Sequence, residues 1–222
     1  MQPARIAELL APFLGDEQLA TADLDRISTY IDILLRWNAR INLTAIRDPD
    51  QIVTRHFGES LFAARHLFPR SPVPPAFPLC SSVSSVVKGL ADIGSGAGFP
   101  GIPIKLWAPD IPVTLVESNH KKSTFLREIV RALILTDINI QTARAESLPR
   151  ASFDVVTLRA VERFDQILPT AATLVAPAGR LALLIGEAQL RTVRELLPNH
   201  TLDTPIRIPN SFSRILVIAR LY

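Results

Sequence analysis

A glycine-rich turn between two short apolar runs constrains this chain more than any other segment. The first apolar run ends at Ile93, and a helix-compatible segment and a second apolar run then lead to Glu117. Glycine lets a chain turn tightly and brings backbone N–H groups close to a ligand. A carboxylate about 20 residues further on suits the hydroxyls of a ribose. The pattern predicts a nucleoside-cofactor cleft at the carboxyl ends of parallel strands, and its glycines are Gly94, Gly96, Gly98 and Gly101.

The composition is that of an ordinary globular protein with an arginine bias. The chain has 222 residues, of which 48% are hydrophobic and 20% are charged, enough for one large domain or one domain with a small appendage. Its formal net charge is only +3, yet 20 of its 24 basic residues are arginine. Arginine suits planar contacts to phosphates and guanine edges, so a nucleic-acid partner is permitted. A genome that favours arginine codons explains the same bias.

The single cysteine, Cys80, excludes intrachain disulfides and cysteine-rich metal sites. A reducing cytoplasm is consistent with that usage. The N-terminus lacks the long apolar core and cleavage site of a signal peptide. No apolar run approaches the roughly 18 residues that a membrane-spanning helix needs. We therefore expect a cytoplasmic protein with no bound metal and no membrane segment.

Three regions follow one another along the chain. Residues 1–68 are expected to form helices only, one with helical periodicity after the cap candidate Thr21 and one that opens at Asp48-Pro49 and runs to about Phe68. Residues 69–88 hold five prolines and five serines, which predicts a loop or linker. Residues 89–222 are expected to form the cofactor domain.

In the third region strands alternate with helices, which predicts a parallel sheet covered on both faces. The last two predicted strands are joined only by a turn near Pro209-Asn210, so they should pair antiparallel. The expected fold is therefore a Rossmann-like, seven-stranded, mostly parallel α/β sheet with one antiparallel strand, as in class I methyltransferases. Predicted strands lie near 90–94, 113–117, 138–143, 154–158, 180–185, 201–206 and 214–220, and helices near 101–107, 119–135, 163–175 and 187–197.

The glycine turn alone fits two kinds of cofactor. Its first three glycines match the G-x-G-x-G of S-adenosylmethionine enzymes, and its last three match the G-x-G-x-x-G of dinucleotide enzymes. Pro100 and Pro103 remove N–H groups at the helix start, where a pyrophosphate needs donors. This and the antiparallel strand favour a methyltransferase over an NAD-dependent dehydrogenase, which stays the alternative.

Four further residues are candidates for the cleft. Glu117 is expected to accept ribose hydroxyls, the alternative being a solvated helix cap. Ala145 and Glu146 follow the third strand, where an adenine would lie, although Glu146 is equally well a surface charge. Arg159 ends the fourth strand, where it would hold a methionine carboxylate or a substrate phosphate. Its alternative role is an ion pair with Glu162.

The absence of several sequence motifs restricts which atom the enzyme could methylate. The fourth strand ends in LRAV rather than the Asn/Asp-Pro-Pro-aromatic tetrad of amino-directed enzymes, and Cys80 lies in the linker rather than in a nucleophile pocket. No lysine stands at the end of the fourth strand for ribose 2′-O transfer. Guanine N7 carries no proton, so its methylation needs positioning rather than a general base.

Several phrases together resemble the RsmG (GidB) family, bacterial 16S ribosomal RNA guanine-N7 methyltransferases. These phrases are DIGSGAGFPGIPIKL, LVESNHKKSTFLREI, FDVVTLRAVERF and RWNARINLTAIRDPDQIVTRHFGESL. The resemblance covers residues from about 20 to 220. It implies S-adenosylmethionine as cofactor and one guanine of the decoding-region loop, position 527 in the usual numbering, as target. The cofactor contacts that the resemblance implies are Gly94, Phe99, Ala145, Glu146 and Arg159. The glycine turn and the carboxylate after it independently indicate Gly96 and Glu117.

The resemblance implies 16S ribosomal RNA or the small ribosomal subunit as partner, and we expect a monomer. Arg159 is the candidate catalytic residue. Arg55 and His56 are candidates to face the cleft. The alternative for Arg55 is an ion pair with Glu59 at i,i+4. Glu59 replaces the family's usual Asp and Ile185 replaces a usual Lys, which leaves a non-catalytic RNA-binding relative as a further alternative. An RNA-phosphate footprint is expected on Arg36, Arg40, Arg47 and Arg55.

Overall fold

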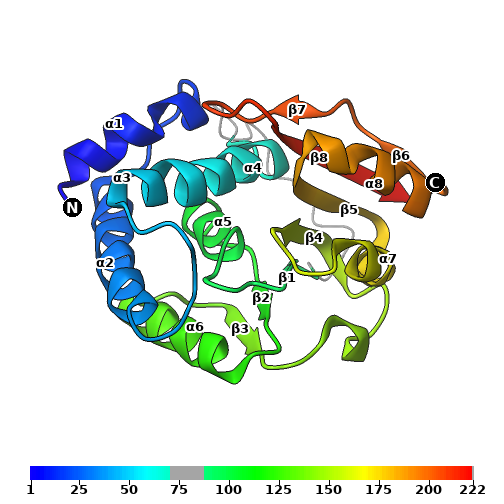
Figure 1. Ribbon diagram of the computed structural model, residues 1–222, viewed down its shortest axis with the longest axis horizontal. Coiled ribbons are helices and arrows are strands. Elements are labelled where there is room, and N and C mark those ends of the chain that lie inside the picture. Colours follow the sequence, from blue (N-terminus) through cyan, green and yellow to red (C-terminus); the bar gives the residue numbers. More distant parts are fainter. Residues whose placement is uncertain (71–87, 222) are drawn as a thin grey trace, which may run out of the picture.

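The central feature of the computed structural model is an eight-stranded sheet with helices on both faces (Figure 1). The structure describes residues 1–70 and 88–221. Its strand order is β3-β2-β1-β4-β5-β8-β6, with β7 also paired to β8. The strands are β1 (Leu90–Ile93), β2 (Val113–Val116), β3 (Ile138–Gln141), β4 (Phe153–Arg159), β5 (Val175–Gly186), β6 (His200–Leu202), β7 (Ile206–Arg207) and β8 (Arg214–Leu221).

The first five strands pair in parallel, and β8 runs antiparallel to β5, β6 and β7. The predicted mostly parallel sheet with one antiparallel strand at its C-terminal end is therefore confirmed. Because Gly186 pairs with Arg214, the start of β8 lies at the same edge as the carboxyl ends of the parallel strands. This edge carries the functional site.

The predicted strand 201–206 is two short strands, β6 and β7, both on the outer side of β8. Asp203 still donates its backbone N–H to the carbonyl of Ile218, 2.8 Å away. Pro205 has no N–H to donate, so the ladder is interrupted there. The sheet consequently has eight strands where the sequence predicts seven.

Helices α1, α2, α4, α5 and α6 lie on one side of the sheet, and α7 and α8 lie on the other (Figure 1). The predicted helix at 187–197 begins with a 3₁₀ turn. The helices are α1 (Pro3–Leu14), α2 (Thr21–Asn38), α3 (Pro49–Gln51), α4 (Glu59–Leu67), α5 (Gly101–Trp107), α6 (His120–Ala132), α7 (Phe164–Leu174) and α8 (Leu190–Leu196), with the π-helix η1 (Ile52–Gly58) and the 3₁₀ turns η2 (Ala145–Ser147) and η3 (Glu187–Gln189).

Alternation along the strands divides the apolar core into two clusters. On β4, Val155 belongs to the cluster under the N-terminal helices, whereas Val156 belongs to the cluster under α7 and α8. Successive strand residues point to opposite faces, so one strand serves both layers. The N-terminal helices share their cluster with α5, α6 and the sheet. Tyr30 and Phe57 of that shared cluster are fully buried.

The N-terminal helices begin largely as the sequence predicts. Asp48 caps α3 by accepting a hydrogen bond from the Gln51 N–H at 2.9 Å, with Pro49 as the first helical residue. Thr21 is not the cap of α2: it is the first helical residue, after Ala20. The π-helix η1, between α3 and α4, was not predicted. Such segments are frequent at functional sites.

Most of the predicted linker 69–88, including Cys80, lies outside the described residues. At its edge, the Arg70 guanidinium lies over the Trp107 ring, 3.9 Å from the centroid. In the described ranges, no helix combines the length and apolarity needed to cross a membrane.

Candidate active site

The glycine turn runs from the end of β1 to the start of α5. Gly94, Gly96 and Gly98 all adopt positive φ, the backbone region that glycine enters without a steric penalty. At Gly98 a side chain would also collide with the Tyr30 hydroxyl, 2.5 Å from the position of a Cβ. At Gly96 the nearest atom to such a Cβ is the carbonyl oxygen of Gly94, at 3.7 Å. The missing side chain at Gly98 therefore lets Tyr30 of helix α2 pack against the turn, whereas Gly96 borders open space.

Two buried carboxylates hold this turn. Asp92 accepts hydrogen bonds from the Gly101 N–H at 3.1 Å and the Thr157 hydroxyl at 2.8 Å. Burial raises the pKa of Asp92 to about 6, and these hydrogen bonds oppose the rise. Glu117 accepts from the Gly96 N–H at 2.9 Å and from the Asn119 N–H at 2.8 Å. Glu117 is buried, so its predicted alternative as a solvated cap is wrong, and Asn119 caps α6 instead.

The start of α5 has no free donors for a pyrophosphate. The Gly101 N–H binds Asp92, and the Ile102 N–H donates to the carbonyl of Gly98 at 2.9 Å. Pro103 has no N–H at all. Dinucleotide sites depend on such donors, so this loop suits a cofactor without phosphates.

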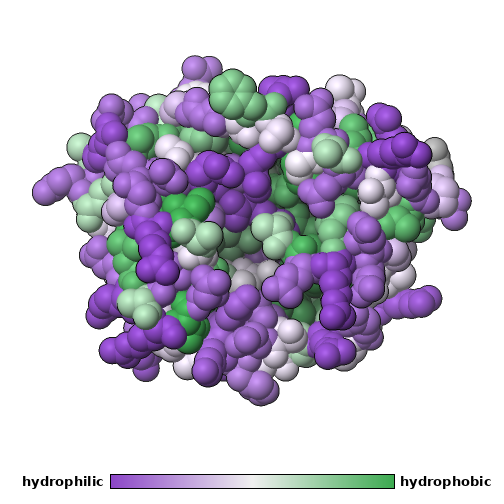
Figure 2. Space-filling view, in the orientation of Figure 1, coloured by the Kyte–Doolittle hydropathy of each residue, from purple (hydrophilic) through white to green (hydrophobic). Residues whose placement is uncertain are grey.

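A cavity of about 660 Å³ opens beside the turn, at the carboxyl ends of the strands. Figure 2 shows a hollow near the middle of this face, with hydrophilic residues around it. The volume lies in the range of small-molecule sites. Every residue that the sequence proposes for cofactor binding lines this cavity: Gly94, Gly96, Phe99, Glu117, Ala145, Glu146 and Arg159.

Ala145 and Glu146 stand in the turn η2, after β3. Ala145 is buried and leaves room beside it, whereas the Glu146 side chain is exposed at the cavity's edge. Phe99 lies between two rings, with the Tyr30 centroid at 5.4 Å and the His56 centroid at 4.8 Å. This stack fixes the Phe99 ring against the N-terminal helices.

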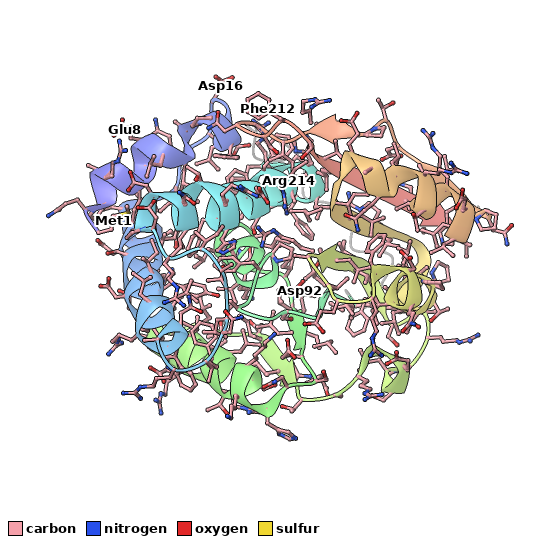
Figure 3. The ribbon with its side chains drawn as sticks, viewed as in Figure 1. Met1, Glu8, Asp16, Asp92, Phe212 and Arg214 are labelled. Atoms are coloured by element: carbon pink, nitrogen blue, oxygen red, sulfur yellow. The ribbon has the colours of Figure 1, made fainter. Side chains whose placement is uncertain are left out.

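Glu59 is a buried carboxylate that three arginines contact, of which Arg159 is the most buried. Its carboxylate is 3.1 Å from Arg55 Nε, 3.1 Å from Arg159 Nη2 and 3.0 Å from Arg214 Nε. The Arg55 pair is the i,i+4 alternative, which is confirmed, whereas the alternative for Arg159, an ion pair with Glu162, is wrong: Arg159 pairs with Glu59. Three guanidinium groups therefore surround this one carboxylate. Figure 3 labels Arg214, at the start of β8, and the buried Asp92 of β1.

Arg159 is the member of this cluster that lines the cavity. Its side chain is 8% exposed, and the two N–H groups of its Nη2 are shared among the Arg55 carbonyl, Glu59 and His56 Nδ1. Its Nε is buried without a hydrogen-bond partner among the described residues. Burial lowers the pKa of Arg159, and Glu59 opposes this. The group stays protonated, because arginine does not lose its proton in proteins.

His56, on the π-helix η1, is held in one protonation state. Its Nδ1 lies 3.1 Å from Arg159 Nη2 and its Nε2 lies 2.8 Å from the Thr44 hydroxyl. Burial, with Arg159, Arg55 and Arg214 nearby, lowers the pKa of His56 to about 3. Arg159 can only donate, so Nδ1 accepts and Nε2 carries the proton.

The loop after α2 forms the facing wall of the cavity. The Asn38 side chain accepts from the N–H groups of Leu43 and Thr44 at 2.9 and 3.1 Å and donates to the Thr44 carbonyl at 2.8 Å. Trp37 anchors the end of α2 by donating to Glu128 at 2.9 Å. The W-N-x-x-x-N-L-T phrase therefore positions Thr44 at the cavity.

Sequence reasoning missed Asp92, Tyr30, Thr44 and Arg214 as site residues. Asp92 had a local signal, a carboxylate at a strand end nine residues before Gly101, but the other three are brought in by distant elements. Within the described part of the chain, no group of three or more His, Cys, Asp or Glu residues is arranged to hold a metal ion.

The sheet order, with its antiparallel β8, is that of class I methyltransferases. The fold is similar to that of a ribosomal protein L11 methylase from Lactobacillus delbrueckii subsp. bulgaricus, with a TM-score of 0.57, 17% identity, and coverage of 76% of this chain and 79% of that one. It is also similar to an S-adenosylmethionine-dependent methyltransferase from Aquifex aeolicus, with a TM-score of 0.51, 14% identity, and coverage of 61% and 83%.

The family follows from the sequence itself. The family model GidB, described as rRNA small subunit methyltransferase G, matches residues 23–205. A ribosomal RNA small subunit methyltransferase G from Xylella fastidiosa is 36% identical over 207 residues, covering 89% of each chain. The chain belongs to the GidB family of small-subunit ribosomal RNA methyltransferases.

Replacing Gly96 should abolish cofactor binding. The backbone there has a φ of +56° and borders the cavity, so a valine side chain would fill the cradle and strain the turn. We expect Gly96→Val to lose calorimetrically detectable S-adenosylmethionine binding. Gly96→Ala, which adds the strain with little bulk, should lose less, and Gly186→Ala, outside the cavity with an ordinary φ, should bind normally. Wild-type affinity in Gly96→Val would contradict this placement of the loop.

His56 should make the protein less stable in mild acid. Its folded pKa of about 3 lies below the ordinary 6.5, so the unfolded chain binds a proton between these values and the folded chain does not. Stability is then lost as the pH falls below about 6.5, by up to about 1.4 kcal/mol per pH unit. Asp92, whose folded pKa is raised to about 6, acts in the opposite sense between about 4 and 6.

Urea unfolding of wild type and His56→Gln at pH 7.5, 6.5, 5.5 and 5.0 isolates the histidine, because Asp92 is common to both proteins. The unfolding free energy of the variant should rise relative to wild type as the pH is lowered. A constant difference across this range would show that His56 titrates normally in the folded protein.

Proposed function

We propose that this chain transfers the methyl group of S-adenosylmethionine to N7 of one guanine in 16S ribosomal RNA. The observation that carries the proposal is the glycine-lined cleft, with Glu117 and Arg159 at its edges, in a chain of the GidB family. The curated relatives that match are named for small-subunit ribosomal RNA methylation. Our proposal applies that activity to this chain and adds the cofactor and the guanine N7 acceptor.

The cavity residues fit the cofactor. Gly96 would admit it against bare backbone, since among the described residues outside its chain neighbours only the Gly94 carbonyl lies within 4 Å of a Cβ there. Gly94 also lines the cavity, and the Val161 side chain packs where its Cβ would be. Glu117 would accept ribose hydroxyls: a carboxylate has about four acceptor positions, and two backbone N–H groups use two of them. Ala145 and Glu146 would border the adenine, with Phe99 as an apolar wall.

Arg159 would hold the methionine carboxylate. Its Nε lacks a partner among the described residues, and it belongs to a cluster with two more guanidinium groups than carboxylates. An anion in the cavity would therefore meet a preorganised positive field. Arg159 is the candidate catalytic residue in this sense, because it would touch and orient the cofactor rather than accept a proton.

When bound, the cofactor supplies an electrophilic methyl group on a sulfonium. Guanine N7 offers a lone pair and carries no proton, so the protein needs to orient and desolvate rather than to remove a proton. The one histidine at the cavity supports this, because its Nδ1 accepts from Arg159 and its Nε2–H binds Thr44. His56 has no free lone pair with which to act as a base.

The N-terminal segment 1–68 would form the RNA side of the cleft, and residues 89–222 the cofactor side. Arg36, Arg40 and Arg47 are exposed near the loop that carries Thr44. Phe212 is 98% exposed on the turn before Arg214, at the edge of the sheet that holds the cavity (Figure 3). Exposed arginines and an exposed aromatic ring suit phosphates and unstacked bases.

We further propose that the enzyme acts as a monomer in the cytoplasm, where ribosomal RNA lies. Every residue assigned above to the cleft comes from one chain. Light scattering across a range of protein concentrations checks the monomer, and a concentration-dependent dimer would exclude it.

Labelling and mapping test the function. Small subunits from cells lacking this protein should gain one labelled methyl group per particle from purified protein and labelled S-adenosylmethionine. Mass mapping should place it on N7 of a single guanine. Cofactor binding without transfer would instead favour a non-catalytic RNA-binding relative. Tighter binding of NAD than of S-adenosylmethionine would favour a dehydrogenase.

Arg159→Ala should lower kcat by at least about 100-fold, since a buried charged contact to the cofactor is lost. It should also lower the urea midpoint, because Glu59 loses a buried partner. Arg159→Lys keeps the charge without the planar fork and should recover stability more than turnover. Arg55→Ala is the matched comparison: it removes a half-exposed arginine that contacts the same carboxylate but does not line the cavity, and it should cost much less turnover than Arg159→Ala. Equal losses in Arg55→Ala and Arg159→Ala would reduce Arg159 to a structural role.

A further inference from the structure

Thr44 is a cavity residue whose hydrogen-bonding capacity is defined by its neighbours. The Ile46 N–H donates to its hydroxyl oxygen at 3.1 Å, and His56 Nε2 lies 2.8 Å from the same oxygen. A threonine hydroxyl has one proton to donate and two lone pairs that accept. The direction of the His56 contact decides what remains free.

Arg159 sets that direction. Its Nη2 lies 3.1 Å from His56 Nδ1 and can only donate, so we assign Nδ1 as the acceptor and place the ring proton on Nε2. His56 Nε2–H therefore donates to Thr44. Both lone pairs of the Thr44 hydroxyl are then used, by His56 and Ile46. Within the described residues nothing accepts its proton, so Thr44 faces the cavity as a donor that cannot accept.

The donor is held in place. Asn38 binds the backbone of Leu43 and Thr44 with three hydrogen bonds, and Asn38 itself is buried. The His56 ring is fixed by Arg159 and by stacking on Phe99 at 4.8 Å. A ligand that meets Thr44 therefore meets a preorganised group, which strengthens discrimination.

The Hoogsteen edge of a purine distinguishes guanine from adenine at one position. Guanine presents N7 and O6, both acceptors, whereas adenine presents N7 and the N6 amino donor. A hydroxyl that can only donate matches O6. Against an adenine amino group the same hydroxyl would leave two donors facing each other, a cost that binding sites use to reject analogues.

We propose that the Thr44 hydroxyl donates a hydrogen bond to O6 of the target base, next to the N7 that receives the methyl group, and so selects guanine. This assignment rests on the proposed function and names the residue that reads the base. Thr44 is a specificity residue that touches the substrate. Arg159 and His56, through Thr44, fix the direction of its proton.

The test pairs a side-chain deletion with a substrate-atom deletion. Small-subunit particles carrying either guanine or 2-aminopurine at the target position are incubated with labelled S-adenosylmethionine. 2-Aminopurine keeps N7 and lacks O6. Wild type, Thr44→Val and Thr44→Ser are compared by kcat/KM on both particles, and cofactor affinity is measured for each protein. For each enzyme, kcat/KM on the guanine particle is divided by kcat/KM on the 2-aminopurine particle. The intrinsic difference in N7 reactivity enters every ratio equally, so it cancels when the enzymes are compared.

Thr44→Val should lose about 10- to 100-fold in kcat/KM on guanine, the usual worth of a base-reading contact, with unchanged cofactor affinity. The ratio of its kcat/KM on guanine to that on 2-aminopurine should be lower than the wild-type ratio by a similar factor. Thr44→Ser should resemble wild type in both respects. Thr44→Cys, a weaker donor, should fall between Ser and Val, and it tests the same assignment if the valine protein unfolds.

An equal guanine preference in wild type, Val and Cys would overturn the assignment, since the hydroxyl would then not address O6. Failure of the proposed function is distinguishable, because wild type would bind cofactor yet leave guanine particles unlabelled. Such a result would leave Thr44 without a base to read.

Discussion

Two buried carboxylates determine the shape of the cofactor turn, and most of the site depends on them. Asp92 fastens the turn where it enters α5, and Glu117 fastens it at Gly96. A glycine turn is intrinsically mobile, so without such anchors its backbone would sample many conformations. The anchors stand at the carboxyl ends of the adjacent strands β1 and β2, which places the turn at the edge of the sheet. The backbone N–H groups at the start of α5 already have acceptors, so they are not available to bind a pyrophosphate.

The N-terminal helices belong to the same unit as this turn. The Tyr30 hydroxyl donates to the carbonyl of Ala97, and the rings of Tyr30, Phe99 and His56 form one stack. Gly98 has no side chain where Tyr30 approaches. The wall that would receive RNA is thus bonded to the loop that would receive the cofactor. A displacement of the wall would therefore shift the loop, and the reverse, because packed interiors transmit strain.

How far the sequence predicts this site depends on how local each signal is. The glycine spacing, the carboxylate after β2 and the cap at Asp48 are signals within a few residues, and the structure has these elements where they were predicted. The seven proposed cofactor residues share one cavity because the carboxyl ends of parallel strands meet at one edge.

The rest depends on contacts between distant segments. The alternative for Arg159 was an ion pair with the nearby Glu162, yet Arg159 binds Glu59, 100 positions away. Glu59 also contacts Arg214, from the C-terminal strand β8. The protonation of His56 follows from those arginines, so no spacing rule reveals it. The break between β6 and β7 lies at Pro205, a residue that the predicted strand 201–206 contains and that local alternation does not exclude.

The central claim is that the turn between Asp92 and Glu117 cradles an adenosyl cofactor, and a crystal structure with S-adenosylhomocysteine tests it most directly. The account predicts the nucleoside beside Gly96, both ribose hydroxyls within about 3 Å of Glu117, and the amino-acid carboxylate on Arg159. A ligand bound elsewhere, or a Glu117 carboxylate that still contacts only Gly96 and Asn119, would contradict it.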